Sequence, residues 1–113
     1  METIARFGEL CGEGPVWDPE SSTLYWTDLS GNRFFRYRNG LAEQLLAGLQ
    51  ICAFRLQRTG GFVIANHQGV FLWDGAGAPR PVVAELDGAR LKINDGTSDA
   101  AGRFLVGSNF YDP

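Results

Sequence analysis

A five-residue pattern recurs along the chain at an interval near 40 residues, and this repeat limits the possible folds more than any other feature. LYWTD at 24–28, FVIAN at 62–66 and FLVGS at 104–108 fall 38 and then 42 residues apart, and each follows a turn-forming segment. A period near 40 with four short strands per unit is typical of the blades of a β-propeller. The repeat therefore predicts an all-β chain built from similar sheet modules.

Short apolar runs separated by turn residues support this prediction. Stretches such as DPESS, RNG and RTGG punctuate the chain, and its 15 glycines are about twice the usual share. One segment is ambiguous, because GLAEQLLAG at 40–48 is the strongest helical candidate and equally predicts a strand that ends in a turn. The predicted strands are Thr3–Phe7, Gly14–Trp17, Thr23–Thr27, Arg33–Tyr37, Cys52–Leu56, Gly61–Ala65, Gly69–Trp73, Arg80–Ala84 and Arg103–Gly107.

The repeat also predicts how the modules divide the chain. By this count there are two blades, at about 8–47 and 48–88, and an incomplete third at 89–113. A closed propeller needs about four to eight blades, so roughly two and a half blades leave two open flanks. Each flank would expose apolar blade surface and an unpaired strand edge. We therefore expect either a portion of a longer propeller or a partial propeller that self-associates through its open blade edges.

Charge and hydropathy exclude several classes of protein. The net charge of −3 lacks the basic footprint that nucleic-acid binding usually requires. No apolar run approaches the roughly 20 residues needed to span a bilayer, and METIARFGEL lacks the apolar centre of a signal peptide. We therefore predict a cytoplasmic protein that binds neither nucleic acid nor membrane. Cys11 and Cys52 lack CxxC spacing and are predicted to be two buried free thiols.

Oxygen-bearing side chains occupy two of three equivalent positions at the start of the first strand of each module. The first strands of a propeller line its central channel, so the residues at their mouths converge on the axis. Glu13 precedes GPVWD, Ile51 precedes CAFRL and Asn94 precedes DGTSD. A carboxylate and an amide oxygen suit a hard cation, and a carboxylate held there is costly without a cation or donor. Two simpler readings remain open: Glu13 caps a turn through backbone N–H groups, and Asn94–Asp95–Gly96 is an ordinary turn.

Three motifs identify a resemblance to a known family. GEGPVWDPESSTLYWTD, GGFVIA at 60–65 and INDGTSDAAGRFLVGS occur in that order and together cover nearly the whole chain. This combination resembles the SMP-30/gluconolactonase/luciferin-regenerating-enzyme family, also called regucalcin-like. The resemblance implies a six-bladed propeller, of which this chain would be the N-terminal portion. It also implies one divalent metal ion on the axis, with calcium or zinc the first candidates, and metal-dependent hydrolysis of small-molecule sugar lactones such as gluconolactone.

The resemblance carries over to individual residues. It assigns Glu13 as a metal ligand and Asn94 as a substrate contact near the metal. Lys92 lies where some family members have an arginine that hydrogen-bonds the substrate, and a lysine is a point charge where an arginine is a planar fork. Asp112 falls near a further substrate-contacting position in a loose alignment. The other family ligands, including an aspartate that doubles as the catalytic base, would follow Pro113, so we expect no catalytic residue in this chain and no activity from it alone.

Three functions remain open on the sequence alone. The chain is the N-terminal portion of a metal-dependent lactonase, a non-catalytic propeller module that only binds, or a self-associating partial propeller. His67 lies in a turn and is predicted to be an exposed loop residue. Trp17, Trp26 and Trp73 lie in strand patterns and are predicted to pack between blades.

Overall fold

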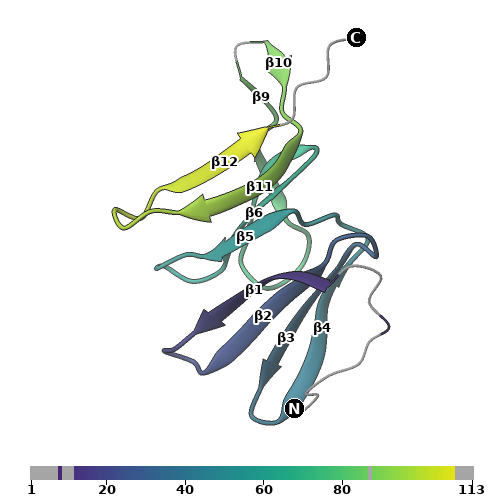
Figure 1. Cartoon of the computed structure of the whole chain (residues 1–113), viewed down its shortest axis with the longest axis vertical. Helices are drawn as coiled ribbons and strands as arrows, with labels where there is room; N and C mark the ends of the chain where they lie inside the picture. The colour runs from purple at the N-terminus through teal and green to yellow at the C-terminus, as the bar shows by residue number, and fades with distance from the viewer. Residues whose placement is uncertain (1–7, 9–11, 87, 109–113) are drawn as a thin grey trace. The chain divides into compact units, whose positions relative to one another are not determined.

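The strands account for every regular element of the chain in the computed structural model, which describes residues 8, 12–86 and 88–108 (Figure 1). All their pairings are antiparallel, which confirms the all-β prediction. No helix in the described part of the chain has the length and apolar character needed to cross a membrane. The strands are β1 (Gly12–Asp18), β2 (Thr23–Asp28), β3 (Arg33–Arg38), β4 (Leu41–Ala47), β5 (Ala53–Leu56), β6 (Phe62–Asn66), β7 (Gly69–Trp73), β8 (Arg80–Val83), β9 (Glu85–Leu86), β10 (Ala89–Arg90), β11 (Ile93–Ser98) and β12 (Phe104–Ser108).

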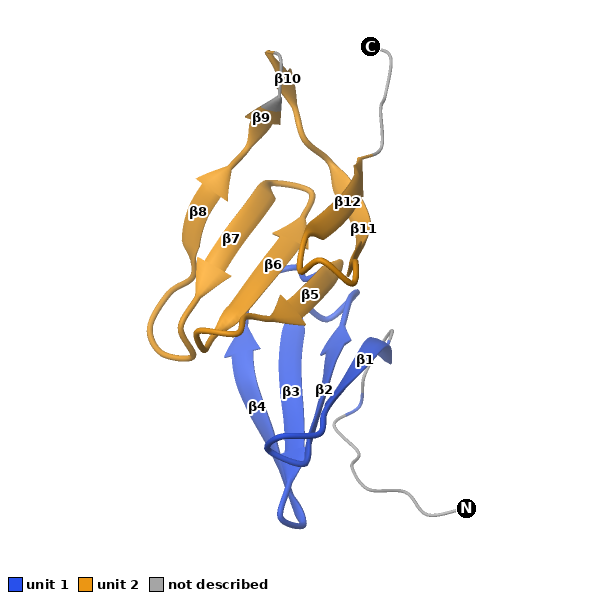
Figure 2. Cartoon of the chain, turned by 90° about the vertical axis from the view of Figure 1, so that its left-hand side faces the viewer, with its two compact units in different colours: residues 1–51 blue, residues 52–113 orange. Residues whose placement is uncertain are grey.

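The chain divides into two units, residues 1–51 and residues 52–113, which are blue and orange in Figure 2. Unit 1 contains a four-stranded sheet in the order β1-β2-β3-β4. Unit 2 contains a second four-stranded sheet, β5-β6-β7-β8, together with the β9–β10 and β11–β12 hairpins. Each four-stranded sheet is a meander of sequential neighbours, which agrees with repeated sheet modules. The predicted strand Thr3–Phe7 and the Cys11 thiol lie outside the described residues. Cys52 forms no disulfide bond within the described part of the chain, and it is half-buried, so the prediction of a buried thiol is wrong for this residue.

A two-residue turn makes residues 41–47 a strand rather than a helix. Asn39 and Gly40 have φ values of 52° and 75°, and left-handed backbone at both central positions is the requirement of a type I′ hairpin turn. Arg38 pairs with Leu41 directly across this turn, and β4 then follows β3 as far as Ala47. The hairpin therefore resolves the ambiguous segment as β4, because pairing with β3 provides partners for its backbone N–H and C=O groups.

The centre of the unit 1 sheet is aromatic. Phe34 and Phe35 are adjacent on β3, and both have 0% exposure. Successive side chains of a strand point to opposite faces, so both faces of this sheet are covered at its centre. The Tyr25 ring lies 6.0 Å from the Phe34 ring, and Trp26 stacks on Phe35 at 5.4 Å. These neighbouring rings on β2 and β3 form the packed centre of the unit.

A buried ion pair closes the β2–β3 turn. The Asp28 side chain is fully buried, and its Oδ2 accepts a hydrogen bond from Arg33 Nη2 at 2.9 Å. Its Oδ1 accepts a second hydrogen bond from the Gly31 backbone N–H at 3.2 Å. Burial of a carboxylate is tolerated because a cation and a backbone donor both compensate its charge.

At the β6–β7 turn, the backbone of Gly69 lies very close to the backbone of β8. Gly69 has φ +127°, and a Cβ at this position would overlap the carbonyl oxygen of Val83. Gly69 pairs with Asn66, which is buried and whose Oδ1 accepts a hydrogen bond from the Gln68 backbone N–H at 2.7 Å. The turn therefore requires glycine at residue 69 for its backbone conformation and for the space.

Unit 2 shows how the first strands of two modules pack. Strand β11 lies beside β5 in both views of the chain. Ala53 of β5, Ala65 of β6 and Ile93 of β11 form a buried apolar cluster. Across the same boundary, Arg55 Nη2 donates to Thr97 Oγ1 at 3.1 Å. First strands that lie side by side in this way agree with a partial β-propeller.

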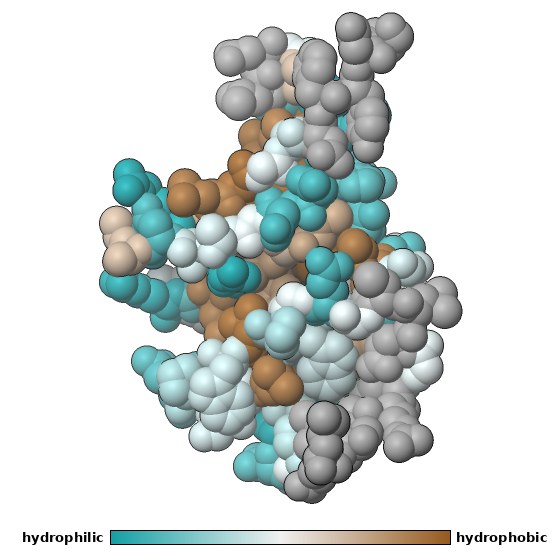
Figure 3. Space-filling model, in the orientation of Figure 1, coloured by the Kyte–Doolittle hydropathy of each residue, from teal (hydrophilic) through white to brown (hydrophobic). Residues whose placement is uncertain are grey.

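Apolar side chains also reach the surface of both units. Brown atoms lie over β12 in Figure 3, where Leu105 and Val106 are 50% and 39% exposed. Trp73 is only 4% exposed, but Trp17 is 57% exposed, so the prediction that Trp17 packs between blades is wrong for this chain. The reason is its position on β1, an edge strand of the unit 1 sheet whose residues are mostly exposed.

Candidate metal and substrate site

Glu13 lies at a β-bulge in β1. It pairs with Thr27 of β2, and the register then shifts before Val16, so β1 has one residue more than β2 over this stretch. Gly14 has φ +60°, and Pro15 cannot donate a hydrogen bond to the neighbouring strand, so both residues suit a bulge. Glu13 itself is exposed. A bulge bends its strand and re-aims the side chains beside it, and here it does so next to the only carboxylate predicted to bind a metal.

Lys92 and Asn94 lie together at the start of β11. Both are exposed, and the Lys92 backbone N–H donates to Ser108 Oγ at 2.9 Å. The register of the β11–β12 pair shifts between Ile93 and Asp95, whose partners are consecutive residues of β12. Asn94 is therefore the extra residue of a second bulge. The structure thus brings both predicted substrate contacts to one strand end, where the chain enters β11.

The strand registers allow Glu13 and Asn94 to be compared within their own modules. The five-residue repeat begins at Leu24 in the first module and at Phe104 in the third. Leu24 pairs with Trp17 of β1, and Phe104 pairs with Ser98 of β11. Glu13 precedes Trp17 by four residues and Asn94 precedes Ser98 by four, as in the sequence alignment. The bulges lie at different points of β1 and β11, so a different reference residue gives a different alignment. The fourth residue of the repeat pairs with Glu13 in the first module and with Asp95 in the third, which aligns Glu13 with Asp95. Asp95 is a carboxylate that the sequence alignment left out, and its Oδ1 accepts the Gly96 N–H at 2.8 Å.

The middle module differs at this position. Its register contains no extra residue between Ala53 and Leu56, and Leu56 lies opposite the first position of the repeat. The residue four places before it is Cys52, so the alignment of Ile51 with Glu13 is displaced by one residue. The displacement arises because Leu56 precedes its partner Phe62 by six residues, whereas Trp17 precedes its partner Leu24 by seven. Neither residue offers a carboxylate or an amide side chain to a cation.

The donor chemistry fits a hard divalent cation, although the donors are few. Glu13 offers carboxylate oxygens and Asn94 a carbonyl oxygen, the ligand types that calcium takes in sets of about six to eight. Within residues 8, 12–86 and 88–108, no group of three or more His, Cys, Asp or Glu side chains is placed to hold a metal ion. Glu13 belongs to unit 1 and Asn94 to unit 2, so their convergence on one cation remains a prediction. Asp112 lies outside the described residues.

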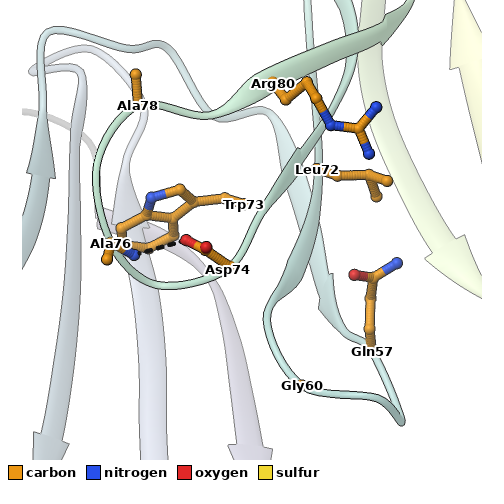
Figure 4. Close-up of a pocket in the computed structure, with 8 residues that line it drawn as sticks. All are labelled: Gln57, Gly60, Leu72, Trp73, Asp74, Ala76, Ala78 and Arg80. Atoms are coloured by element: carbon orange, nitrogen blue, oxygen red, sulfur yellow. Dashed lines mark hydrogen bonds between the residues drawn. The ribbon is translucent and has the colours of Figure 1, made fainter.

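A cavity of about 400 Å³ lies beside the β7–β8 loop (Figure 4). Two of its polar side chains hold the loop together: Asp74 Oδ1 accepts the Ala76 N–H at 3.0 Å, and Trp73 Nε1 donates to the Gly77 carbonyl at 3.1 Å. His67 lies exposed in the β6–β7 turn, as predicted. Neither feature adds a candidate for the chemistry of the site.

Comparison with known proteins identifies the family. The sequence pattern of the SMP-30/Gluconolactonase/LRE-like region matches residues 11–112. The chain belongs to this family. The match confirms the resemblance carried by the three motifs, and it includes the stretches that contain Glu13, Lys92 and Asn94.

Two curated relatives in the family each share about a third of the aligned residues with this chain. A 6-deoxy-6-sulfogluconolactonase from Pseudomonas putida is 32% identical over 96% of this chain and 38% of its own length. A regucalcin from Danio rerio is 32% identical over 99% of this chain and 39% of its own length. The chain therefore spans less than two fifths of each of these relatives.

Solved structures share the fold. A gluconolactonase from Xanthomonas campestris superposes with a TM-score of 0.77 at 24% identity, over 88% of this chain and 35% of the other. A calcium-binding regucalcin from Agrobacterium tumefaciens gives a TM-score of 0.75 at 24% identity, over 91% of this chain and 36% of the other. This chain thus shares the all-β fold of part of these two proteins, in agreement with a partial propeller.

Proposed function

We propose that the protein to which this chain belongs hydrolyses sugar lactones with the help of one divalent cation, calcium or zinc. The observation that carries the proposal is the family match over residues 11–112, together with relatives named as lactonases. The bulged ends of β1 and β11, where the GEGPVW and NDGTSD motifs lie, support it further. In this proposal the modules are about two and a half blades of a six-bladed propeller, with blades at about 8–47 and 48–88 and an incomplete one at 89–113.

The proposal gives each of three side chains a distinct task. Glu13 holds the cation through its carboxylate, and the cation when bound polarises the lactone carbonyl as a Lewis acid. Asn94 positions the substrate, since its amide both donates and accepts hydrogen bonds. Lys92 directs an ammonium group with three rotatable donors toward the substrate oxygens, without the fixed two-pronged geometry of an arginine. The substrate class this favours is a polyhydroxylated lactone, which offers many oxygen acceptors.

The metal site is tested by the effect of cations on stability. A cation that binds only the folded chain stabilises it by about 1.4 kcal/mol at a free concentration ten times its Kd. We expect calcium or zinc to raise the urea midpoint of the wild-type chain and to have little effect on Glu13→Ala. Glu20→Ala is the matched control, because Glu20 is an exposed carboxylate on the β1–β2 turn and lies outside the proposed site. Equal stabilisation of the Glu13→Ala variant and the wild type would rule out Glu13 as a ligand.

The isolated chain is expected to have no lactonase activity. One predicted metal ligand and two substrate contacts do not supply a general base, and the described residues hold no three-membered ligand group. With calcium or zinc present, acid release from gluconolactone should match the rate in buffer alone. A complete gluconolactonase of the family serves as the positive control. Turnover above background that disappears in Glu13→Ala would contradict this expectation.

A further inference from the structure

We propose that unit 2 carries a second binding site, for a small organic anion, in the cavity between the β5–β6 and β11–β12 turns. The cavity has a volume of about 570 Å³, within the range of small-ligand pockets. Arg55, Arg58, Thr59 and Ser98 contribute its cationic and hydroxyl groups, and Phe104 contributes an aromatic wall. It lies at the opposite end of β11 from Asn94, about 13 Å away along the strand at the usual rise per residue. The inference therefore does not depend on the proposed lactonase function.

The two guanidinium groups give the cavity its positive charge. Arg55 is half-buried and held in place, with Nη1 donating to the Phe54 carbonyl at 2.7 Å and Nη2 donating to Thr97 Oγ1 at 3.1 Å. Both partners are neutral, so the charge of Arg55 is not compensated by them. In the described part of the chain, neither Arg55 nor Arg58 forms an ion pair. A positioned guanidinium with donors to spare is the usual partner of a carboxylate or a phosphate.

The one carboxylate that lines the cavity does not cancel this charge. Asp99 Oδ2 accepts a hydrogen bond from Arg103 Nε at 2.6 Å, and Oδ1 accepts the backbone N–H groups of Ala101 and Arg103 at 3.0 and 2.9 Å. The Arg103 backbone N–H, followed by its side chain, lowers the pKa of Asp99 below the ordinary value. Asp99 is thus ionised at neutral pH, but its charge is directed to Arg103 and to the turn that it closes. An anion in the cavity would meet Arg55 and Arg58.

The fold itself does not require cations at this place. The corresponding β1–β2 turn of the first module carries Asp18 and Glu20, and Ser21 Oγ donates to Asp18 Oδ2 at 2.6 Å. The hairpin in the first module therefore closes with acidic residues in its turn. A positive charge at Arg58 is not required to close the equivalent hairpin of unit 2. The cavity also has apolar walls, to which Phe104 contributes. The ligand class that fits is a carboxylate or phosphate group attached to an apolar, flat carbon body.

Titration of the full 113-residue chain with phenyl phosphate and with benzoate tests the proposal. Backbone amide shifts in NMR spectra should change saturably at Thr59 and Ser98, with a Kd of about 1 mM or tighter for at least one of the two probes. Arg58→Gln should weaken that binding about tenfold, because one charge-assisted hydrogen bond is lost. Arg90→Gln is the matched control, since Arg90 is exposed in the same unit and does not line the cavity, and it should change the Kd by less than about twofold.

A second variant and two control ligands, inorganic phosphate and benzyl alcohol, complete the test. Arg55→Gln should weaken binding as Arg58→Gln does, and the amide spectrum of each variant reports whether the chain is still folded. The comparison of phenyl phosphate with benzoate identifies the preferred anionic group, and tighter binding of either than of inorganic phosphate supports a role for the apolar walls. The proposal is overturned if neither probe saturates, if benzyl alcohol produces the same shifts as the anions, or if a folded Arg58→Gln variant binds as tightly as the wild type.

Discussion

Replacing Gly69 by alanine is expected to lower the free energy of unfolding of the unit 2 sheet by about 3 kcal/mol or more. The new Cβ would overlap the backbone carbonyl of Val83, and backbone cannot rotate away as the end of a side chain can. A left-handed φ adds about 1–2 kcal/mol for any residue other than glycine. Urea unfolding followed by far-UV circular dichroism measures the loss, and a chain that is already unfolded without urea counts as the same result.

Gly75→Ala is the control that separates these two contributions. Gly75 also has a positive φ, +99°, but a Cβ there would meet nothing within 4 Å. Its cost should therefore be only the backbone term of about 1–2 kcal/mol. If Gly69→Ala and Gly75→Ala cost the same, the close approach of the β6–β7 turn to β8 is not present in solution.

Phe34→Ala is expected to cost about 3–5 kcal/mol, the usual range for removing a fully buried phenylalanine. Phe34 has 0% exposure and lies at the centre of the unit 1 sheet, 6.0 Å from the Tyr25 ring. Leu41→Ala is the control, because Leu41 is 58% exposed and its truncation should cost within about 0.5 kcal/mol. Chemical unfolding with tryptophan fluorescence compares the variants, and similar losses for both would show that the unit 1 sheet is not packed around Phe34.

The repeat was sufficient to predict most of the fold. Its period specifies sheet modules, and the strand boundaries follow from where Gly, Asn and Asp interrupt apolar runs. The β4 segment could not be settled in this way, because its apolar spacing suits a helix and a strand equally. What decided it was the Asn39-Gly40 turn, whose left-handed residues return the chain along β3. The β9–β10 hairpin was missed because strands of two residues leave no periodic pattern to read.

The candidate site could be predicted as a set of residue types but not as a geometry. Glu13 and Asn94 are identifiable because the repeat places an acid and an amide at matching strand ends. The bulges beside them do not appear in a repeat alignment, since an extra residue changes the pairing without changing the apolar pattern. That is why Asp95 was missed. Ile51 was aligned one residue away from its register position for another reason, because Leu56 precedes Phe62 by six residues and Trp17 precedes Leu24 by seven. The strand registers supplied both corrections.

The cationic cavity of unit 2 was also not predicted, and the reason is its origin in two turns far apart in the sequence. Arg58 and Ser98 come from different hairpins, and only the packing of β11 beside β5 brings those hairpins together. From the sequence alone, a single arginine in a turn is predicted to be exposed to solvent, and this prediction is correct for most such residues.

Paramagnetic broadening by Mn²⁺ tests most directly the central claim that Glu13, at the bulge of β1, binds a divalent cation. Mn²⁺ prefers the same oxygen ligands as Mg²⁺ and Ca²⁺, and it broadens the NMR signals of nuclei near it even when binding is weak. The account predicts that low Mn²⁺ concentrations broaden the Gly14 amide of the wild type and of the Glu20→Ala control, and that Glu13→Ala abolishes the effect. No selective broadening at Gly14, or equal broadening in the Glu13→Ala variant, would contradict it.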